Sequence, residues 1–315
     1  MKLLFVADPL ESFKTYKDST YTMMREAAAR GHTLLACEPR QLRWRSGAPV
    51  TALAREVVLG AEGREPWFEV RAERELALAE AGAVLMRKDP PFDSEYFYAT
   101  HLLGQAEREG ARVFNRPAAL RDHPEKLAIL EFAQFTPPTL VTREEEQIRR
   151  FHAEHRDIIL KPLDGMGGMG IFRVGADGLN LGSIVETLNR QGAQTVMVQK
   201  FLPAIAEGDK RVLVIGGEPV PHCLARIPQG GEVRGNLAAG GKGVAQPLSA
   251  RDREIALALG PTLAARGLLL VGLDIIGECL TEINVTSPTC FREISDQSGF
   301  DVARFFIDKL EAALR

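Results

Sequence analysis

The sequence predicts an α/β domain with a parallel sheet over residues 1–122, followed by an α+β domain with antiparallel sheets over residues 123–315. In the first third of the chain, apolar strand-like segments alternate with helix-like segments, which is typical of a parallel sheet covered by helices. From about residue 115 the alternation stops, and four prolines punctuate the chain: Pro117, Pro124, Pro137 and Pro138. Beyond them, strand-like segments come in pairs, which favours antiparallel hairpins.

The chain begins with the pattern of a strand, a helix and a second strand. Residues 3–7 are apolar and predict the first strand. Asp18 or Ser19 can cap a helix that continues to Gly31, because their side-chain oxygens accept from the free N–H groups of a helix start. Residues 33–37 predict the second strand. This order is the first half of a βαβ unit.

The same pattern returns before the prolines. Residues 83–86 predict a strand, residues 94–109 a helix that ends at Gly110, and residues 113–114 a further short strand. The intervening segment 44–78 is charged and mixed, and it gives no clear order of elements.

The second half predicts three hairpins after a helical piece over residues 125–130. Each hairpin joins two apolar runs. The pairs are 158–160 with 171–174, 211–215 with 219–225, and 268–276 with 279–285.

Composition points to a soluble globular protein that acts on small anions. A formal net charge of −3 gives no general attraction for nucleic acid or an anionic membrane. The four cysteines lie far apart and form no CxxC pair, which argues against a zinc site or a disulfide framework and favours reduced thiols in the cytoplasm. No apolar stretch has the pattern of a signal peptide or the length of a membrane span.

A glycine-dense loop is the first candidate for chemistry. Lys161 precedes the loop 164–170, whose spacing satisfies G-x-G-x-x-G through Gly165, Gly167 and Gly170. The dinucleotide fingerprint requires a helix directly after such a loop, whereas residues 171–175 have strand character. The remaining reading is a hairpin tip whose backbone N–H groups cover phosphates. The alternative is an inert hairpin loop.

An acidic hairpin is the second candidate. Glu282 and Asn284 stand two residues apart, so on a strand their side chains leave the same face. Asp274 falls opposite Glu282 if the loop between the strands holds an odd number of residues, such as 277–279. Two carboxylates and an amide oxygen would suit one or two Mg²⁺ ions bridged by phosphate. The alternative is a solvated carboxylate pair on an edge strand.

These residues resemble the ATP-grasp ligases, and the local sequences resemble the prokaryotic glutathione synthetases over nearly the whole chain. The stretches that carry the resemblance are 17–19 (KDS), 86–93 (MRKDPPFD), 159–168 (ILKPLDGMGG), 225–232 (ARIPQGGE), 271–277 (VGLDIIG) and 282–289 (EINVTSPT). The resemblance implies a Rossmann-like pre-ATP-grasp domain followed by an ATP-grasp domain. It also implies that ATP phosphorylates the cysteinyl carboxylate of γ-glutamylcysteine and that glycine displaces phosphate to give glutathione.

The resemblance further implies roles at the nucleotide. Phosphates would be held by Lys126, Lys161, Gly165, Gly167 and Gly168, adenine by Gln199, Lys200, Phe201 and Leu202, and ribose by Asp209. Arg211 and Arg226 would stabilise the γ-phosphate and the acyl phosphate. A structural salt bridge from Arg211 to Glu282 or Asp274 is the competing explanation. The metal would be Mg²⁺, with Mn²⁺ also accepted, on Asp274, Glu282 and Asn284.

Substrate contacts are expected from Asp18, Arg87 and Lys88, which follow strand ends of the first domain, and from Arg292, which follows the metal strand. Each could instead be a surface or helix-end charge. Residues 227–242 are rich in glycine and predict a mobile lid. A homo-oligomer, a tetramer by family habit, is expected. The rival functions are a D-alanine–D-alanine or glutamate-adding ligase and a nucleotide-binding regulatory protein.

Overall fold

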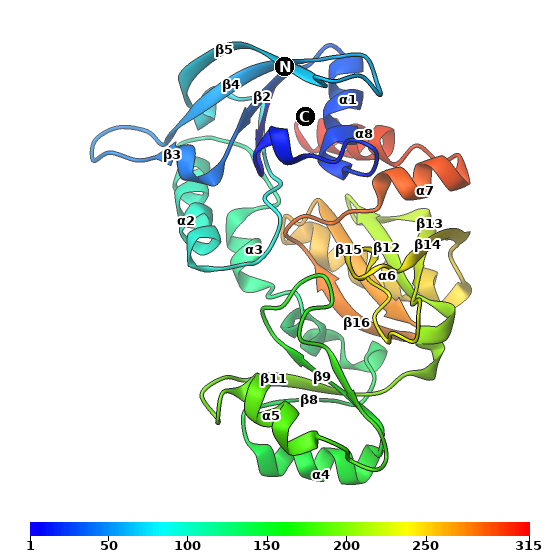
Figure 1. The fold of residues 1–315 in the computed structure, drawn as a ribbon. Helices are drawn as coiled ribbons and strands as arrows, with labels where there is room; N and C mark the ends of the chain where they lie inside the picture. Colours follow the sequence, from blue (N-terminus) through cyan, green and yellow to red (C-terminus); the bar gives the residue numbers. More distant parts are fainter.

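The computed structural model describes all 315 residues, which form three β-sheets and eight α-helices (Figure 1). The molecule is elongated, with the N-terminal seven-stranded sheet at one end and a four-stranded sheet at the other. A five-stranded sheet lies between them. No helix is both long enough and apolar enough to cross a membrane.

Four parallel strands form the centre of the N-terminal sheet. In spatial order they are β2 (Thr33–Cys37), β1 (Lys2–Val6), β6 (Ala83–Met86) and β7 (Val113–Phe114). The helices of this part are α1 (Ser19–Ala29), α2 (Ser94–Arg108) and α3 (Pro117–Asp122). Asp18 caps α1 by accepting from the N–H of Tyr21 at 2.7 Å, and Gly110 takes a φ of 101° after α2. The predicted strand and helix order is confirmed here.

The unassigned segment 44–78 contains a long antiparallel hairpin. It pairs β4 (Thr51–Leu59) with β5 (Phe68–Ala77), and β4 also pairs with β2 and with the short β3 (Leu42–Arg43). The sheet is therefore mixed, with an antiparallel extension that the sequence pattern did not reveal. The reason is burial: the middle of β5 is exposed, so its residues need not alternate between apolar and polar.

The four-stranded sheet carries the glycine loop. Its order is β10 (Phe172–Val174), β9 (Ile158–Pro162), β11 (Val196–Lys200) and β8 (Thr139–Thr142), with all neighbours antiparallel. The helices α4 (Glu145–His155) and α5 (Leu181–Asn189) cover it (Figure 1). Buried aliphatic residues such as Ile158, Leu160 and Val185 hold sheet and helices together, because burying apolar surface is the main stabilising term.

The five-stranded sheet carries the acidic hairpin. Its order is β14 (Lys242–Pro247), β13 (Glu218–Ile227), β12 (Asp209–Ile215), β15 (Leu270–Ile276) and β16 (Cys279–Asn284), again antiparallel throughout. All three predicted hairpins are present. The helices α6 (Ala250–Ala265) and α7 (Phe291–Ser298) pack against this sheet.

The C-terminal helix α8 (Val302–Ala313) returns to the N-terminal part and packs against α1 (Figure 1). Phe306 and Leu310 of α8 share one buried cluster with Leu3 and Phe5 of β1. Short 3₁₀ helices complete the fold: η1 (Leu10–Ser12), η2 (Pro39–Gln41), η3 (Leu78–Glu80), η4 (Leu127–Phe135), η5 (Pro203–Glu207) and η6 (Leu237–Ala239). The helical piece expected near residues 125–130 corresponds to η4.

Candidate active site

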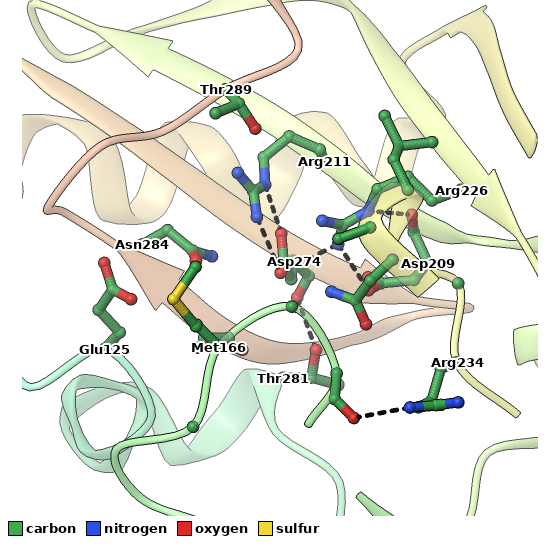
Figure 2. Close-up of a pocket in the computed structure, with 18 of the residues that line it drawn as sticks. Glu125, Met166, Asp209, Arg211, Arg226, Arg234, Asp274, Thr281, Asn284 and Thr289 are labelled. Atoms are coloured by element: carbon green, nitrogen blue, oxygen red, sulfur yellow. Dashed lines mark hydrogen bonds and ion pairs between the residues drawn. The ribbon is translucent and has the colours of Figure 1, made fainter. Parts of the chain in front are cut away.

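A cavity of about 490 Å³ is lined by residues of the two antiparallel sheets and their loops, and by loops and the start of α1 in the N-terminal part. One wall is the glycine loop and the end of β11, and a second is formed by strands of the five-stranded sheet (Figure 2). The third wall comes from loops of the N-terminal part. Seventeen of the nineteen predicted site residues line this cavity.

The glycine loop joins β9 to β10, as predicted. Gly167 and Gly168 have φ values of 60° and 85°, in the left-handed region that residues with a side chain avoid. A Cβ atom on Gly168 would also lie 2.8 Å from Oδ1 of Asn236. Glycine is therefore required by both conformation and space, and the loop lines the cavity.

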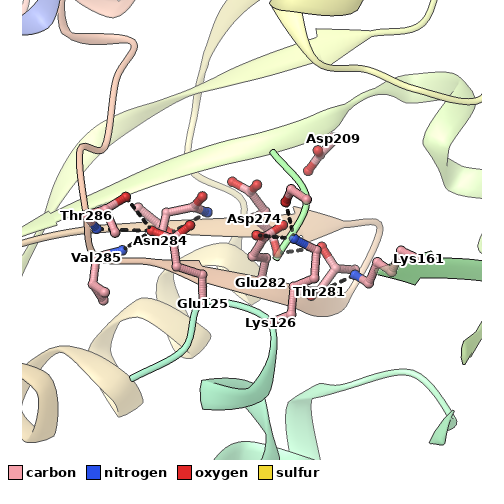
Figure 3. A network of polar contacts seen from close by, with 12 residues as sticks. Glu125, Lys126, Lys161, Asp209, Asp274, Thr281, Glu282, Asn284, Val285 and Thr286 are labelled. Carbon is pink, nitrogen blue, oxygen red and sulfur yellow. Dashed lines mark hydrogen bonds and ion pairs between the residues drawn. The ribbon is translucent and has the colours of Figure 1, made fainter. Parts of the chain in front are cut away.

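Two buried lysines approach the acidic hairpin (Figure 3). Nζ of Lys126 donates to the carbonyl of Gly165 at 2.5 Å and to Oε1 of Glu282 at 3.3 Å. Nζ of Lys161 donates to the carbonyl of Thr281 at 3.3 Å, and burial lowers the pKa of this lysine. Both ammonium groups line the cavity, where they can bind an anionic ligand.

The acidic hairpin brings its three side chains together. Asp274 on β15 lies directly opposite Glu282 on β16, and Asn284 follows two residues later on the same face (Figure 3). The predicted pairing is confirmed.

The turn that produces this register differs from the prediction. Residues 277–278 form a two-residue turn, and a bulge at Thr281 supplies the extra residue. The expected odd-membered loop was wrong. The turn length alone does not determine the register of β15 and β16, because a bulge adds one residue to one strand and shifts the pairing beyond it.

The donor set of this hairpin fits a divalent metal. Asn284 donates its amide N–H to the carbonyl of Gly272 at 3.2 Å, which leaves its amide oxygen for a ligand. Together with the carboxylates of Asp274 and Glu282, this oxygen gives the hard donors that Mg²⁺ prefers. Nowhere in the chain do three His, Cys, Asp or Glu side chains converge closely enough to hold a metal alone. Oxygens of a phosphate and of water would therefore have to complete the coordination.

Two arginines and two aspartates form a buried ion-pair cluster (Figure 2). Asp274 accepts from Nε of Arg211 at 2.6 Å and pairs with Arg226 at 3.0 Å. Arg226 also pairs with Asp209 at 2.5 Å. The salt bridge from Arg211 to Asp274, weighed as the alternative to a phosphate contact, is present in this structure.

The pKa values of the two aspartates in the cluster are shifted in opposite directions. Burial would raise the pKa of Asp274, but the adjacent guanidinium groups of Arg211 and Arg226 outweigh it and hold this pKa well below its usual range. Burial raises the pKa of Asp209 to about 6, against the effect of Arg226. Oδ1 of Asp209 is buried without a hydrogen-bond partner, so this oxygen could accept from a ligand hydroxyl.

The segment expected to face adenine lies in the cavity wall at the end of β11, next to Ile159. All four residues of this segment line the cavity: Gln199, Lys200, Phe201 and Leu202. Asp209, the residue expected to bind ribose, lines it as well. Gln199 is anchored by donating its side-chain amide to the hydroxyl of Thr139 at 3.1 Å.

Of the four expected substrate residues, two line the cavity. Asp18 and Arg87 do so, while Lys88 pairs with Asp8 at 2.9 Å outside it. Arg292 pairs with Glu62 at 2.7 Å and does not line the cavity either. The structure does not bring Lys88 and Arg292 to the site, and their assignment stays a prediction.

Glu125 lines the cavity but was not among the site residues predicted from the sequence. Its Oε1 accepts from the N–H of Val285 at 2.9 Å, and from the N–H and the hydroxyl of Thr286 at 3.0 and 2.8 Å. It therefore fixes the loop that follows Asn284. Burial raises its pKa. The signal that could have revealed it is its position directly before Lys126.

The predicted lid segment lies across the glycine loop. Between β13 and β14 it carries η6, Arg234 and Asn236, and Nη1 of Arg234 donates to the carbonyl of Gly168 at 3.5 Å. Several further lining residues were also missed by the sequence reading: Lys14, Lys17, Ser287, Thr289, Cys290 and Glu293.

Comparisons with known proteins identify the family. Residues 1–121 match the model of the prokaryotic glutathione synthetase N-terminal domain, and residues 125–299 match that of the ATP-grasp domain. A glutathione synthetase from Ralstonia nicotianae is 61% identical over 99% of this chain and 96% of its own length. One from Nitrosomonas europaea is 60% identical over 99% of this chain and 98% of its own.

Solved structures support the same fold at lower sequence identity. D-cycloserine synthetase DcsG superposes with a TM-score of 0.70 at 16% identity, covering 99% of this chain and 100% of its own. The ATP-grasp ligase PsnB, complexed with a minimal precursor, superposes with a TM-score of 0.63 at 21% identity, covering 98% of each chain. With both of its domain models matched and relatives above 50% identity along its whole length, the chain belongs to the prokaryotic glutathione synthetase family of ATP-grasp proteins.

Proposed function

We propose that this protein is an ATP-dependent ligase that joins γ-glutamylcysteine and glycine to form glutathione, releasing ADP and phosphate. The observation that carries the proposal is the convergence, in one cavity, of two buried lysines, a glycine loop and an acidic hairpin. Membership of the glutathione synthetase family supports the choice of substrates.

The chemistry explains why such a site is needed. A carboxylate is a poor acceptor for an amine until one of its oxygens becomes part of a good leaving group. Transfer of the γ-phosphoryl group from ATP to the cysteinyl carboxylate gives an acyl phosphate, and the amine of glycine then displaces phosphate to form the amide. The protein must therefore position three reactants and neutralise negative charge.

We assign the nucleotide contacts as follows. Lys126, Lys161 and the glycine loop hold the phosphates, since both buried ammonium groups line the cavity with that loop. The strand end 199–202 faces adenine, and the unpartnered oxygen of Asp209 accepts from ribose. Mg²⁺, with Mn²⁺ as a substitute, would be held by Asp274, Glu282 and Asn284, together with phosphate oxygens, and would neutralise charge on the phosphates.

Arg211 and Arg226 act on the transferred phosphoryl group. Both now pair with Asp274, so a phosphate entering the cavity competes with this carboxylate for two guanidinium groups. Guanidinium groups bind phosphate oxygens with paired, directional hydrogen bonds, which suits them to this exchange. Residues 227–242 close over the site and keep water from the acyl phosphate.

We also propose a cellular compartment and an oligomeric state for the protein. The four unpaired cysteines suit a reducing cytoplasm. A homo-oligomeric assembly stays a prediction, which light scattering of the purified protein would test.

Product analysis tests the function. The purified protein is incubated with ATP, Mg²⁺, γ-glutamylcysteine and a panel of amines including glycine and D-alanine, and the products are identified by mass. We expect glutathione, ADP and phosphate in equal amounts, with glycine preferred among the amines. AMP and pyrophosphate, or an amide formed without γ-glutamylcysteine, would contradict the proposal.

A further inference from the structure

Strand β16, which carries Glu282 and Asn284, lies at the edge of the five-stranded sheet. Its ladder with β15 ends at the pair of Gly272 and Asn284. No strand lies on its other side, so the backbone N–H groups that point away from β15 need partners from elsewhere. Two of the three proposed metal ligands therefore belong to a strand that the sheet supports from one side, and Asn284 is the last residue of that strand.

Glu125 supplies partners along this open edge (Figure 3). Its backbone carbonyl accepts from the N–H of Ile283 at 3.0 Å. Its Oε1 accepts from the N–H of Val285 at 2.9 Å, and from the N–H and the hydroxyl of Thr286 at 3.0 and 2.8 Å. Ile283 and Val285 are two residues apart, so their N–H groups point to the same side of the strand. Glu125 thus takes the place of a neighbouring strand at the end of β16.

Asn115 binds the other polar backbone group of Val285. Its side-chain amide donates to the carbonyl of Val285 at 2.8 Å and to the carbonyl of Leu270 at 2.8 Å. Its Oδ1 accepts from the N–H of Leu270, the first residue of β15, at 3.0 Å. Asn115 is buried and does not line the cavity. Two side chains from outside the five-stranded sheet therefore hold the N–H and the carbonyl of Val285.

These contacts bear directly on the metal ligands. Val285 follows Asn284, so holding its backbone fixes the strand end that carries this amide. The amide of Asn284 is itself oriented by its bond to the carbonyl of Gly272 at 3.2 Å. Mg²⁺ requires oxygen ligands at about 2.0–2.1 Å in near-octahedral geometry, and a strand end that shifted by about 1 Å would lose that fit.

We propose that Glu125 and Asn115 are positioning residues, which hold the end of β16 so that its metal ligands keep the spacing that a divalent cation requires. This role rests on the proposed function, which places Mg²⁺ or Mn²⁺ on this strand. Neither residue has to contact the metal. Removing groups that orient metal ligands typically weakens metal binding about 10- to 100-fold.

Metal binding tests this role in the whole protein. Mn²⁺ is titrated in the presence of ADP, free Mn²⁺ is measured by electron paramagnetic resonance, and a titration of ADP alone is subtracted. In Glu125→Ala and in Asn115→Ala, the dissociation constant for Mn²⁺ should rise at least about tenfold. Glu125→Gln should stay within about threefold of the wild type, because its amide oxygen can still accept the same hydrogen bonds.

Glu131→Gln is the matched control. Glu131 lies on η4 shortly after Glu125, is exposed, and pairs with Arg266 at 2.6 Å outside the cavity. This variant should keep the wild-type dissociation constant. In every variant, a misfolded fraction lowers the number of Mn²⁺ sites, whereas displaced ligands lower the affinity of each site. The titration therefore separates a general folding defect from a loss of positioning.

A wild-type dissociation constant in either alanine variant would overturn the role of that residue. A loss in Glu125→Gln as large as that in Glu125→Ala would also overturn it, because this pattern would mark the Glu125 carboxylate as a metal ligand. Wild-type protein that binds no Mn²⁺ beyond that bound by ADP would reject the proposed metal site, and the positioning role with it. The reaction is judged separately: if the wild type binds Mn²⁺ with ADP but forms no glutathione, the proposed function fails and the variants still decide the positioning role.

Discussion

At the scale of single residues, the positive and negative charges of the buried arginine–aspartate cluster are equal in number. Arg211 and Arg226 oppose Asp209 and Asp274 within one buried cluster, so the four side chains carry no net charge when all are ionised. Burying such a cluster is tolerable only because each charge is paired. In the proposed mechanism, a phosphate that enters the cavity would replace Asp274 as the partner of the two guanidinium groups.

Glu282 and Asn284 give the first test at this scale. Glu282→Ala and Asn284→Ala should each lower kcat about a hundredfold, because loss of one group that stabilises transition-state charge typically costs about 3 kcal/mol. Circular dichroism should show a native fold in both. Glu278→Ala is the control, since this exposed residue sits in the turn of the same hairpin and outside the cavity. If activity fell only in step with the folded fraction, the hairpin would be structural.

At the scale of elements, the segment between β13 and β14 is a glycine-rich wall of the cavity. Its glycines leave few apolar side chains to bury, so contacts within the segment offset little of the entropy lost on ordering it. In this structure it rests on the glycine loop through Arg234. We expect bound nucleotide and substrate to strengthen this closed position and their release to open it.

Limited trypsin digestion tests the lid. Cleavage after Arg234 should be fast in the free protein and slowed at least about tenfold by ATP, Mg²⁺ and γ-glutamylcysteine together. Arg234→Gln serves as the control, because it removes the cleavage site and should abolish the fragment pair. Equal cleavage rates with and without ligands would show that the segment does not close.

At the scale of the whole molecule, the cavity exists because two parts of the chain face each other. Helix α8 returns to pack on α1, so residues near both termini share a buried cluster. The loops before α1 and after β6 therefore lie opposite the acidic hairpin and α7. In the proposed function, the acidic hairpin faces the nucleotide and the N-terminal loops face the substrate.

Local patterns explain which parts of this layout could be predicted. The β15–β16 pairing follows from apolar alternation and the Glu282–Asn284 spacing, both of which are short-range features. The β4–β5 hairpin escaped prediction because β5 is largely exposed and its side chains obey no burial pattern. Glu125 escaped because its significance depends on residues far away in sequence, such as Thr286.

An isotope experiment tests the central claim, the acyl phosphate intermediate. γ-Glutamylcysteine labelled with ¹⁸O in its cysteinyl carboxylate is converted with ATP and glycine, and the released phosphate is analysed by mass spectrometry. If the carboxylate attacks the γ-phosphorus, one labelled oxygen should appear in each phosphate and the other in the new amide carbonyl of glutathione. Phosphate without label, or label found in AMP, would contradict the mechanism.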